Sequence, residues 1–89
     1  MPSTIGQEGL AVEVLSKNNS REEMEQKLRY YFRAGVRLVW YVDVAKRTVQ
    51  VFHSPGKSTR LAEPAVLDGG DVLPGFKLPL RKLFADLNS

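Results

Sequence analysis

The chain has 89 residues, of which 43% are hydrophobic, and it carries 13 Lys and Arg against 10 Asp and Glu, for a net charge of +3. This length suits one small domain and excludes two, and the apolar runs are too short for a transmembrane helix. The absence of cysteine excludes disulfides, thiolate nucleophiles and Cys-ligated metals. Because the chain starts without a signal-peptide pattern, we expect a cytoplasmic protein with no membrane partner.

The first elements predicted are a strand and a helix. Residues 10–15 form a short apolar run rich in β-branched side chains, which is typical of a strand buried on both faces. Ser20, with Glu23 three residues later, forms a capping box at the start of a helix. Apolar residues at three- and four-residue spacing then predict a helix over residues 21–34, which Gly35 ends.

The next two strands are predicted to form a hairpin. Residues 36–43 alternate between two faces, and residues 48–53 read as another strand. Only residues 44–47 separate them, so the two strands should pair antiparallel. The strand at residues 10–15 is joined to the strand at residues 36–43 through a helix, which predicts a right-handed β-α-β crossover and parallel pairing.

The last third of the chain is rich in turn residues. We expect turns at residues 54–57, 68–71 and 73–76, a short edge strand at residues 58–61 and a weak strand at residues 65–67. Pro79 can open a final helix with one apolar face. The predicted fold class is α/β, with a small mixed β-sheet, a β-α-β crossover and a β-hairpin. Residues 1–9 are assigned to an N-terminal tail and residues 10–87 to a single domain.

Two charged residues stand at positions where apolar residues are expected. Glu13 interrupts the buried strand run, and a buried carboxylate needs a partner or a proton. Lys27 lies between Met24 and Tyr31 on the apolar stripe of the helix. If the helix covers the sheet face to which Glu13 points, the two side chains should meet. They could then hold a metal and orient an attacking water, as in phosphodiester hydrolysis, or form a structural ion pair at the edge of the core.

Several sequence blocks occur in a recognisable order. They are Ala11–Ser16, Lys27-Leu28 with Tyr31, Ala34–Val36, Val39–Asp43 and Leu73–Phe76. Over roughly residues 8–85 this series resembles the bacterial Uma-two family of restriction endonucleases, within the PD-(D/E)XK nuclease superfamily. The resemblance implies a restriction-endonuclease-like core, here the C-terminal portion of a fold truncated at its N-terminus. It also implies Mg²⁺-dependent DNA cleavage by an Asp, a Glu and a Lys. By position, Glu13 is the catalytic and metal-binding Glu and Lys27 the catalytic Lys.

The sequence departs from this family pattern at the motif Asp. Where the family has Pro-Asp, this chain has Glu8-Gly9, and alternation along the strand would turn Glu8 away from Glu13 unless the chain kinks at Gly9. Glu13 alone would hold Mg²⁺ weakly, so we expect impaired nuclease activity. The alternative is a non-catalytic remnant of the fold that acts by self-association or weak nucleic-acid binding. An exposed sheet edge would favour a homo-oligomer, and DNA is the candidate substrate or ligand.

Other candidate residues carry weaker signals. His53 is expected to be an ordinary surface residue, and residues 68–71 a turn rather than a cation loop. Trp40 is expected in the core, and Tyr41 to be at most half exposed. Seven basic residues are either phosphate contacts or solvated surface: Arg21, Arg29, Arg33, Lys46, Arg47, Lys57 and Arg60.

Overall fold

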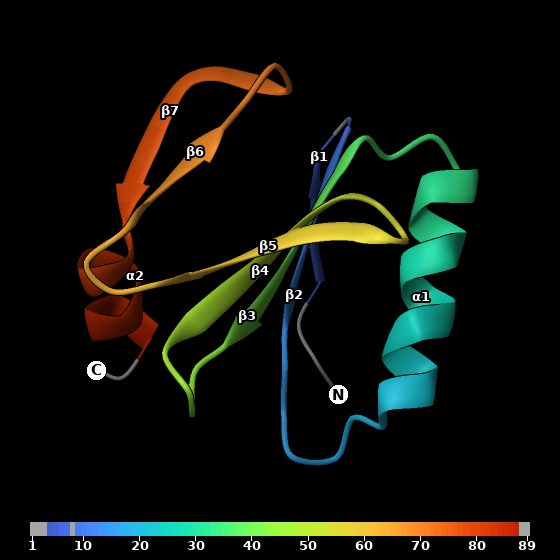
Figure 1. The fold of residues 1–89 in the computed structure, drawn as a ribbon, viewed down its shortest axis with the longest axis horizontal. Coiled ribbons are helices and arrows are strands. Elements are labelled where there is room, and N and C mark those ends of the chain that lie inside the picture. The colour runs from blue at the N-terminus through green and yellow to red at the C-terminus, as the bar shows by residue number, and fades with distance from the viewer. Residues whose placement is uncertain (1–3, 8, 88–89) are drawn as a thin grey trace.

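The computed structural model describes residues 4–7, by their backbone, and residues 9–87. A five-stranded sheet has the order β1-β2-β3-β4-β5, and a second sheet consists of β6 and β7 (Figure 1). In chain order the elements are β1 (Thr4–Gln7), β2 (Leu10–Val14), α1 (Arg21–Arg33), β3 (Leu38–Asp43), β4 (Thr48–Ser54), β5 (Lys57–Ala62), β6 (Val66–Gly69), β7 (Leu73–Pro79) and α2 (Leu80–Leu87). Within the described residues, neither helix has the length and hydropathy needed to cross a membrane.

The predicted β-α-β crossover and hairpin are both present. β2 pairs parallel with β3, and β3 pairs antiparallel with β4, so the sheet is mixed as expected. The capping box forms at the predicted residue, because the Ser20 hydroxyl accepts a hydrogen bond from the backbone N–H of Glu23 at 3.0 Å. Gly35 follows the helix with a φ of +102°, which a residue with a side chain rarely adopts.

The two faces of the five-stranded sheet bury different partners. Alternate residues of β3, namely Leu38, Trp40 and Val42, pack with the buried residues of β6 and α2. Val39 and Tyr41 point to the opposite face and pack beneath α1. Figure 1 shows α1 on one side of the sheet and the β6–β7 hairpin with α2 on the other. Even-numbered residues of β3 therefore face the β6–β7 hairpin and α2, and the odd-numbered residues Val39 and Tyr41 face α1.

Two strands lie where the sequence predicts other structure. The backbone of Thr4–Gln7 pairs antiparallel with β2, within the segment assigned to a tail. Gly9, with a φ of +86°, supports the chain reversal before β2. The turn predicted at residues 73–76 is wrong, because these residues open β7, which pairs with β6. Pro74 and Gly75 resemble turn residues, but pairing with β6 outweighs this local preference.

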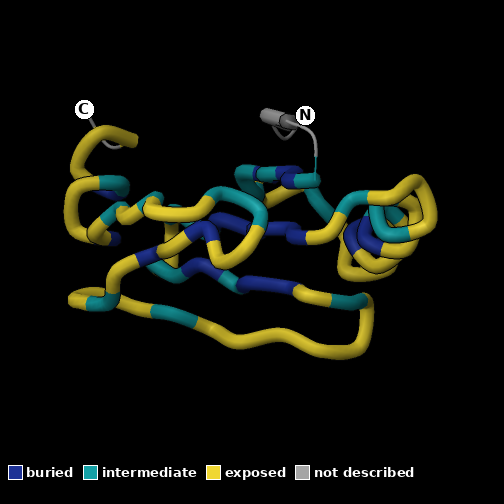
Figure 2. Tube along the Cα trace, turned by 90° about the horizontal axis from the view of Figure 1, so that it is seen from above, coloured by how far each residue is buried: buried dark blue, intermediate teal, exposed yellow. Residues whose placement is uncertain are grey.

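β5 forms an exposed edge of the five-stranded sheet. Among the described strands it pairs only with β4, and all of its residues except the half-buried Leu61 are exposed (Figure 2). An edge strand is predicted here from the sequence, and β5 is somewhat longer than that prediction. β5 therefore contributes little to the core and leaves one row of backbone groups facing outward.

Candidate functional site

Glu13 is a fully buried carboxylate on the α1 face of the sheet. Glu13 lies two residues after Ala11 in β2, so the two side chains point to the same face of the sheet. Ala11 belongs to the apolar cluster beneath α1. Its residue in the parallel register of β3 is Tyr41. The exposed fraction of Glu13 is 0%. Because an unpaired charge at such a position would be costly, the fold must supply donors to this side chain.

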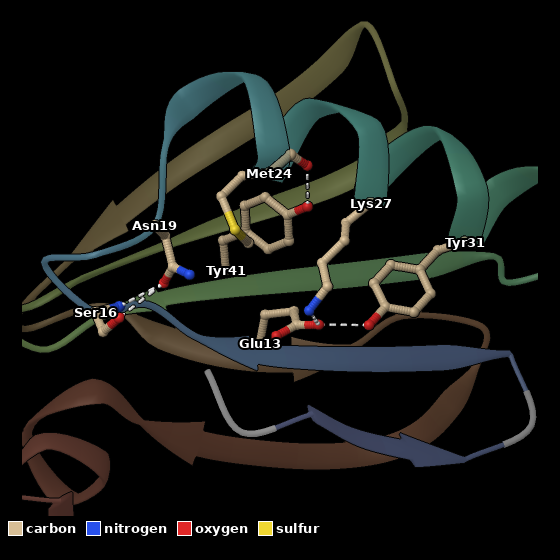
Figure 3. A network of polar contacts seen from close by, with 7 residues as sticks. All are labelled: Glu13, Ser16, Asn19, Met24, Lys27, Tyr31 and Tyr41. Carbon is tan, nitrogen blue, oxygen red and sulfur yellow. Dashed lines mark hydrogen bonds and ion pairs between the residues drawn. The ribbon is translucent and has the colours of Figure 1, made fainter. Parts of the chain in front are cut away.

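Helix α1 supplies two of these donors. Lys27 and Tyr31 lie one helical turn apart, on the side of α1 that faces β2 (Figure 3). The Lys27 Nζ lies 3.0 Å from Glu13 Oε1, and the Tyr31 hydroxyl donates to the same oxygen at 2.5 Å. The meeting of Glu13 and Lys27 predicted from the sequence is confirmed. Tyr31 is an addition that spacing alone could have indicated, since it follows Lys27 at i+4 on the same stripe.

The ammonium of Lys27 connects this buried oxygen to the surface. Its side chain is 37% exposed, whereas Glu13 is buried. The hydrogen bond to Glu13 raises the pKa of Lys27 above its ordinary 10.5, although partial burial acts in the opposite direction. Lys27 is therefore a cation at neutral pH and not a proton acceptor. In this state it can bind an anionic group such as a phosphodiester oxygen.

Tyr41 has a structural role beside this site. Its hydroxyl donates to the backbone carbonyl of Met24 at 2.6 Å, which ties β3 to α1. Burial raises the pKa of this phenol, with the Glu13 carboxylate adding to the effect. Trp40 is 5% exposed and Tyr41 6% exposed, so the expectations of a core Trp40 and of a Tyr41 at most half exposed are both confirmed.

The described residues do not fit the Mg²⁺ ion that this type of site implies. Mg²⁺ requires octahedral oxygen coordination and keeps several waters, usually with one or two carboxylates. Within residues 9–87 there is no group of three or more His, Cys, Asp or Glu side chains able to hold a metal. Glu13 is fully buried, and its Oε1 already accepts from Lys27 and Tyr31. Glu8, the neighbouring carboxylate considered from the sequence, lies outside the described residues.

Gly9, which the resemblance places at the motif Asp position, has a backbone suited to glycine. Its φ of +86° lies in the left-handed region, and a Cβ built there would be 3.2 Å from a side-chain carbon of Val72. Its carbonyl accepts hydrogen bonds from the N–H groups of Arg37 and Leu38, both at 2.9 Å. A larger residue at this position would strain the backbone just before β2, where these hydrogen bonds hold the chain against the start of β3.

A groove of about 1060 Å³ lies beside α1, away from Glu13. Four basic residues from separate segments line it: Lys17, Arg21, Lys46 and Arg60. Its sheet residues come from β3, β4 and β5, whereas Lys27 and Tyr31 face β2 on the other side of β3. Three of these basic residues, Arg21, Lys46 and Arg60, were among the seven considered as phosphate contacts or solvated surface. Their position around one groove could not be predicted from the sequence, because it depends on strand order.

The remaining candidates are an exposed histidine and an aspartate next to a turn; Asp68 and Gly69, which were predicted to lie in the turn, instead end β6. His53 is exposed near the end of β4. Asp68 accepts a hydrogen bond from the N–H of Gly70 at 2.9 Å, which is typical of a turn-forming aspartate. Neither residue therefore adds a catalytic or metal-binding group to the Glu13 site.

Comparison with known proteins identifies the family that the order of the sequence blocks resembles. The model of the Uma2 family, described as "Putative restriction endonuclease", matches residues 9–81. The chain belongs to this family. The match begins at Gly9, so it includes β2, α1 and the strands that follow. A search of curated proteins found no match.

A solved structure of similar fold supports the architecture. It is described as the crystal structure of a putative nuclease belonging to DUF820 from Anabaena variabilis ATCC 29413. The two structures superpose with a TM-score of 0.76 at 20% sequence identity, over 86% of this chain and 44% of that one. The chain therefore has a nuclease-like α/β fold and spans less than half the length of that structure.

Proposed function

We propose that this chain is a DNA endonuclease-family domain whose hydrolytic site is incomplete. The observation that carries the proposal is the state of Glu13, which is fully buried and hydrogen-bonded through Oε1 to Lys27 and Tyr31. Gly9 provides no carboxylate at the motif Asp position. Family membership favours phosphodiester chemistry, but the described residues do not offer Mg²⁺ the oxygen ligands it needs.

In this proposal Lys27 is the part of the site that reaches DNA. Its ammonium is partly exposed and is kept protonated by Glu13, so it can contact a phosphodiester oxygen. Glu13 supplies the counter-charge that holds the ammonium in place. Lys27 is thus assigned to binding phosphate, and Glu13 to positioning Lys27.

A plasmid-nicking assay tests the incomplete site. Supercoiled plasmid is incubated with the wild type, Glu13→Gln and Lys27→Ala, each with Mg²⁺, Mn²⁺ or EDTA. We expect cleavage by the wild type to remain at the EDTA background. Metal-dependent nicking by the wild type that both substitutions abolish would contradict the proposal and establish a working nuclease.

A second candidate function is non-catalytic binding of nucleic acid in the groove beside α1. Its lining has four basic residues and two acidic ones, Glu25 and Asp43. Glu25 forms an ion pair with Arg21 at 3.6 Å, which partly neutralises both. The remaining excess of positive charge suits a phosphate backbone, since sequence-independent affinity comes largely from such contacts.

We also infer that β5 is the edge through which self-association would occur. It is exposed along nearly its whole length and carries Lys57 and Arg60. Like charges on an edge oppose pairing of two copies, so association should strengthen as salt screens them. The molar mass in solution, measured by light scattering at rising protein and salt concentration, tests this homo-oligomer.

A further inference from the structure

The strongest unassigned feature is the convergence of two donors on one buried oxygen. Lys27 Nζ and the Tyr31 hydroxyl both reach Glu13 Oε1, from successive turns of the same helix (Figure 3). One donor is charged and the other neutral. The ammonium balances the charge of the carboxylate, while the phenol fixes its orientation without adding charge.

Burial makes this arrangement restrictive for a metal ion. Glu13 has no exposed surface, so a hydrated cation cannot reach it unless α1 or the two donor side chains move. A cation that took Oε1 would displace a charge-assisted hydrogen bond from Lys27 and a second bond from Tyr31. It would also have to sit beside an ammonium of the same sign, which is unfavourable at short range.

We propose that Tyr31 is a positioning residue that, together with Lys27, holds the Glu13 carboxylate against α1 and closes it to divalent cations. This inference deepens the proposed function, because it gives the reason why the retained Glu does not act as a metal ligand. Tyr31 acts through Glu13 and is not itself assigned to contact with substrate. The phenol is half-buried, so removing its oxygen changes the hydrogen bonding with little change in apolar packing.

Paramagnetic broadening by Mn²⁺ tests this role without DNA or catalysis. Mn²⁺ prefers the same oxygen ligands as Mg²⁺. It is titrated into the ¹⁵N-labelled full chain, and the amide signals of Glu13, Val14 and Lys27 are followed. We expect no saturable broadening of these amides in the wild type. Tyr31→Phe should gain it, and Lys27→Gln should gain it more strongly because it also removes the repelling charge.

Tyr30→Phe is the matched control. Tyr30 is the adjacent residue of the same type but is 65% exposed, so its substitution should leave the Mn²⁺ response as in the wild type. Saturable broadening at Glu13 in the wild type would overturn the inference, as would a folded Tyr31→Phe that responds like the wild type. If Tyr31→Phe does not fold, the inference is overturned when Lys27→Gln also shows no gain, and supported when it does.

The two proposals can fail separately. Metal-dependent nicking by the wild type that Glu13→Gln and Lys27→Ala both abolish would overturn the incomplete site, even if the free chain takes up no Mn²⁺ at Glu13. Conversely, Mn²⁺ bound at Glu13 without nicking would overturn the role of Tyr31 and leave the incomplete site in place.

Discussion

Loss of its partner is more costly for the charge of Glu13 than for the charge of Lys27. Lys27 is partly exposed, so water can solvate its ammonium when Glu13 is removed, whereas Glu13 is buried and cannot gain water in the same way. The pair therefore does not stabilise the fold as a simple sum of two contacts. Removing the lysine should lower the free energy of unfolding by more than its partial exposure suggests.

Lys27→Met is expected to lower the free energy of unfolding by about 2 to 3 kcal/mol, because it leaves a buried carboxylate without its cation. This value is below that of a fully buried pair, since the exposed part of Lys27 is screened by solvent and Tyr31 still donates to Glu13. Chemical denaturation measures the change. Lys82→Met, at an exposed lysine of α2, is the control and should change stability little. Equal destabilisation of the two variants would contradict a specific role for Lys27.

The pH dependence of stability gives a separate test of the same pair. The pKa of Lys27 is raised above 10.5, so the folded state keeps this proton longer than the unfolded state. Its contribution is therefore complete below about pH 10.5 and is lost as pH rises through the folded pKa. Tyr41 acts in the same direction, because burial raises its pKa and the unfolded phenol ionises first.

We expect the stability difference between the wild type and Lys27→Met to narrow as pH rises above about 10.5. Tyr41 is present in both proteins, so its contribution should largely cancel from this difference. Denaturation curves at a series of alkaline pH values measure it. A stability difference that stays constant across this pH range would show that the stabilising effect of Lys27 does not depend on its charge.

At the scale of elements, the backbone at Gly9, just before β2, limits which side chain can stand at the position where the family has its Asp. We expect Gly9→Ala to lower the free energy of unfolding by about 1 to 3 kcal/mol, because a left-handed backbone must then carry a Cβ close to Val72. Gly9→Asp, which restores the motif carboxylate, should cost at least as much. Gly56→Ala is the control, since a Cβ there meets nothing within 4 Å. Similar stabilities for Gly9→Ala and Gly56→Ala would show that the junction tolerates a side chain.

The elements that were predicted correctly from the sequence are those whose local sequence signals agree with how they pack in the fold. The helix after Ser20 has both a cap and an apolar stripe, and β3 alternates between two buried faces. β7 could not be predicted, because Pro74 and Gly75 are typical turn residues and the pairing of this segment with β6 is specified only by the fold. Glu13 and Lys27 could be paired in advance because a crossover helix must cover its own strand.

At the scale of the molecule, α1 covers only part of its sheet face. On one flank it meets Glu13 in β2, and on the other it leaves the basic groove open over β3, β4 and β5. The two flanks are separated by β3 in the strand order. Phosphate contacts in the basic groove and the Glu13 network can therefore be altered independently.

Salt dependence of DNA binding tests the groove. If the groove binds phosphates, Lys46→Ala/Arg60→Ala should reduce the steepness of log K against log salt by about 2, close to 0.9 for each phosphate that is no longer neutralised. Fluorescence anisotropy with a labelled duplex measures this slope. Lys77→Ala/Arg81→Ala is the matched control, because it removes the same charge from exposed positions of β7 and α2, neither of which lines the groove. Equal reductions in both double variants would assign the attraction to net charge alone, whereas a reduction confined to the first would place the DNA backbone beside α1.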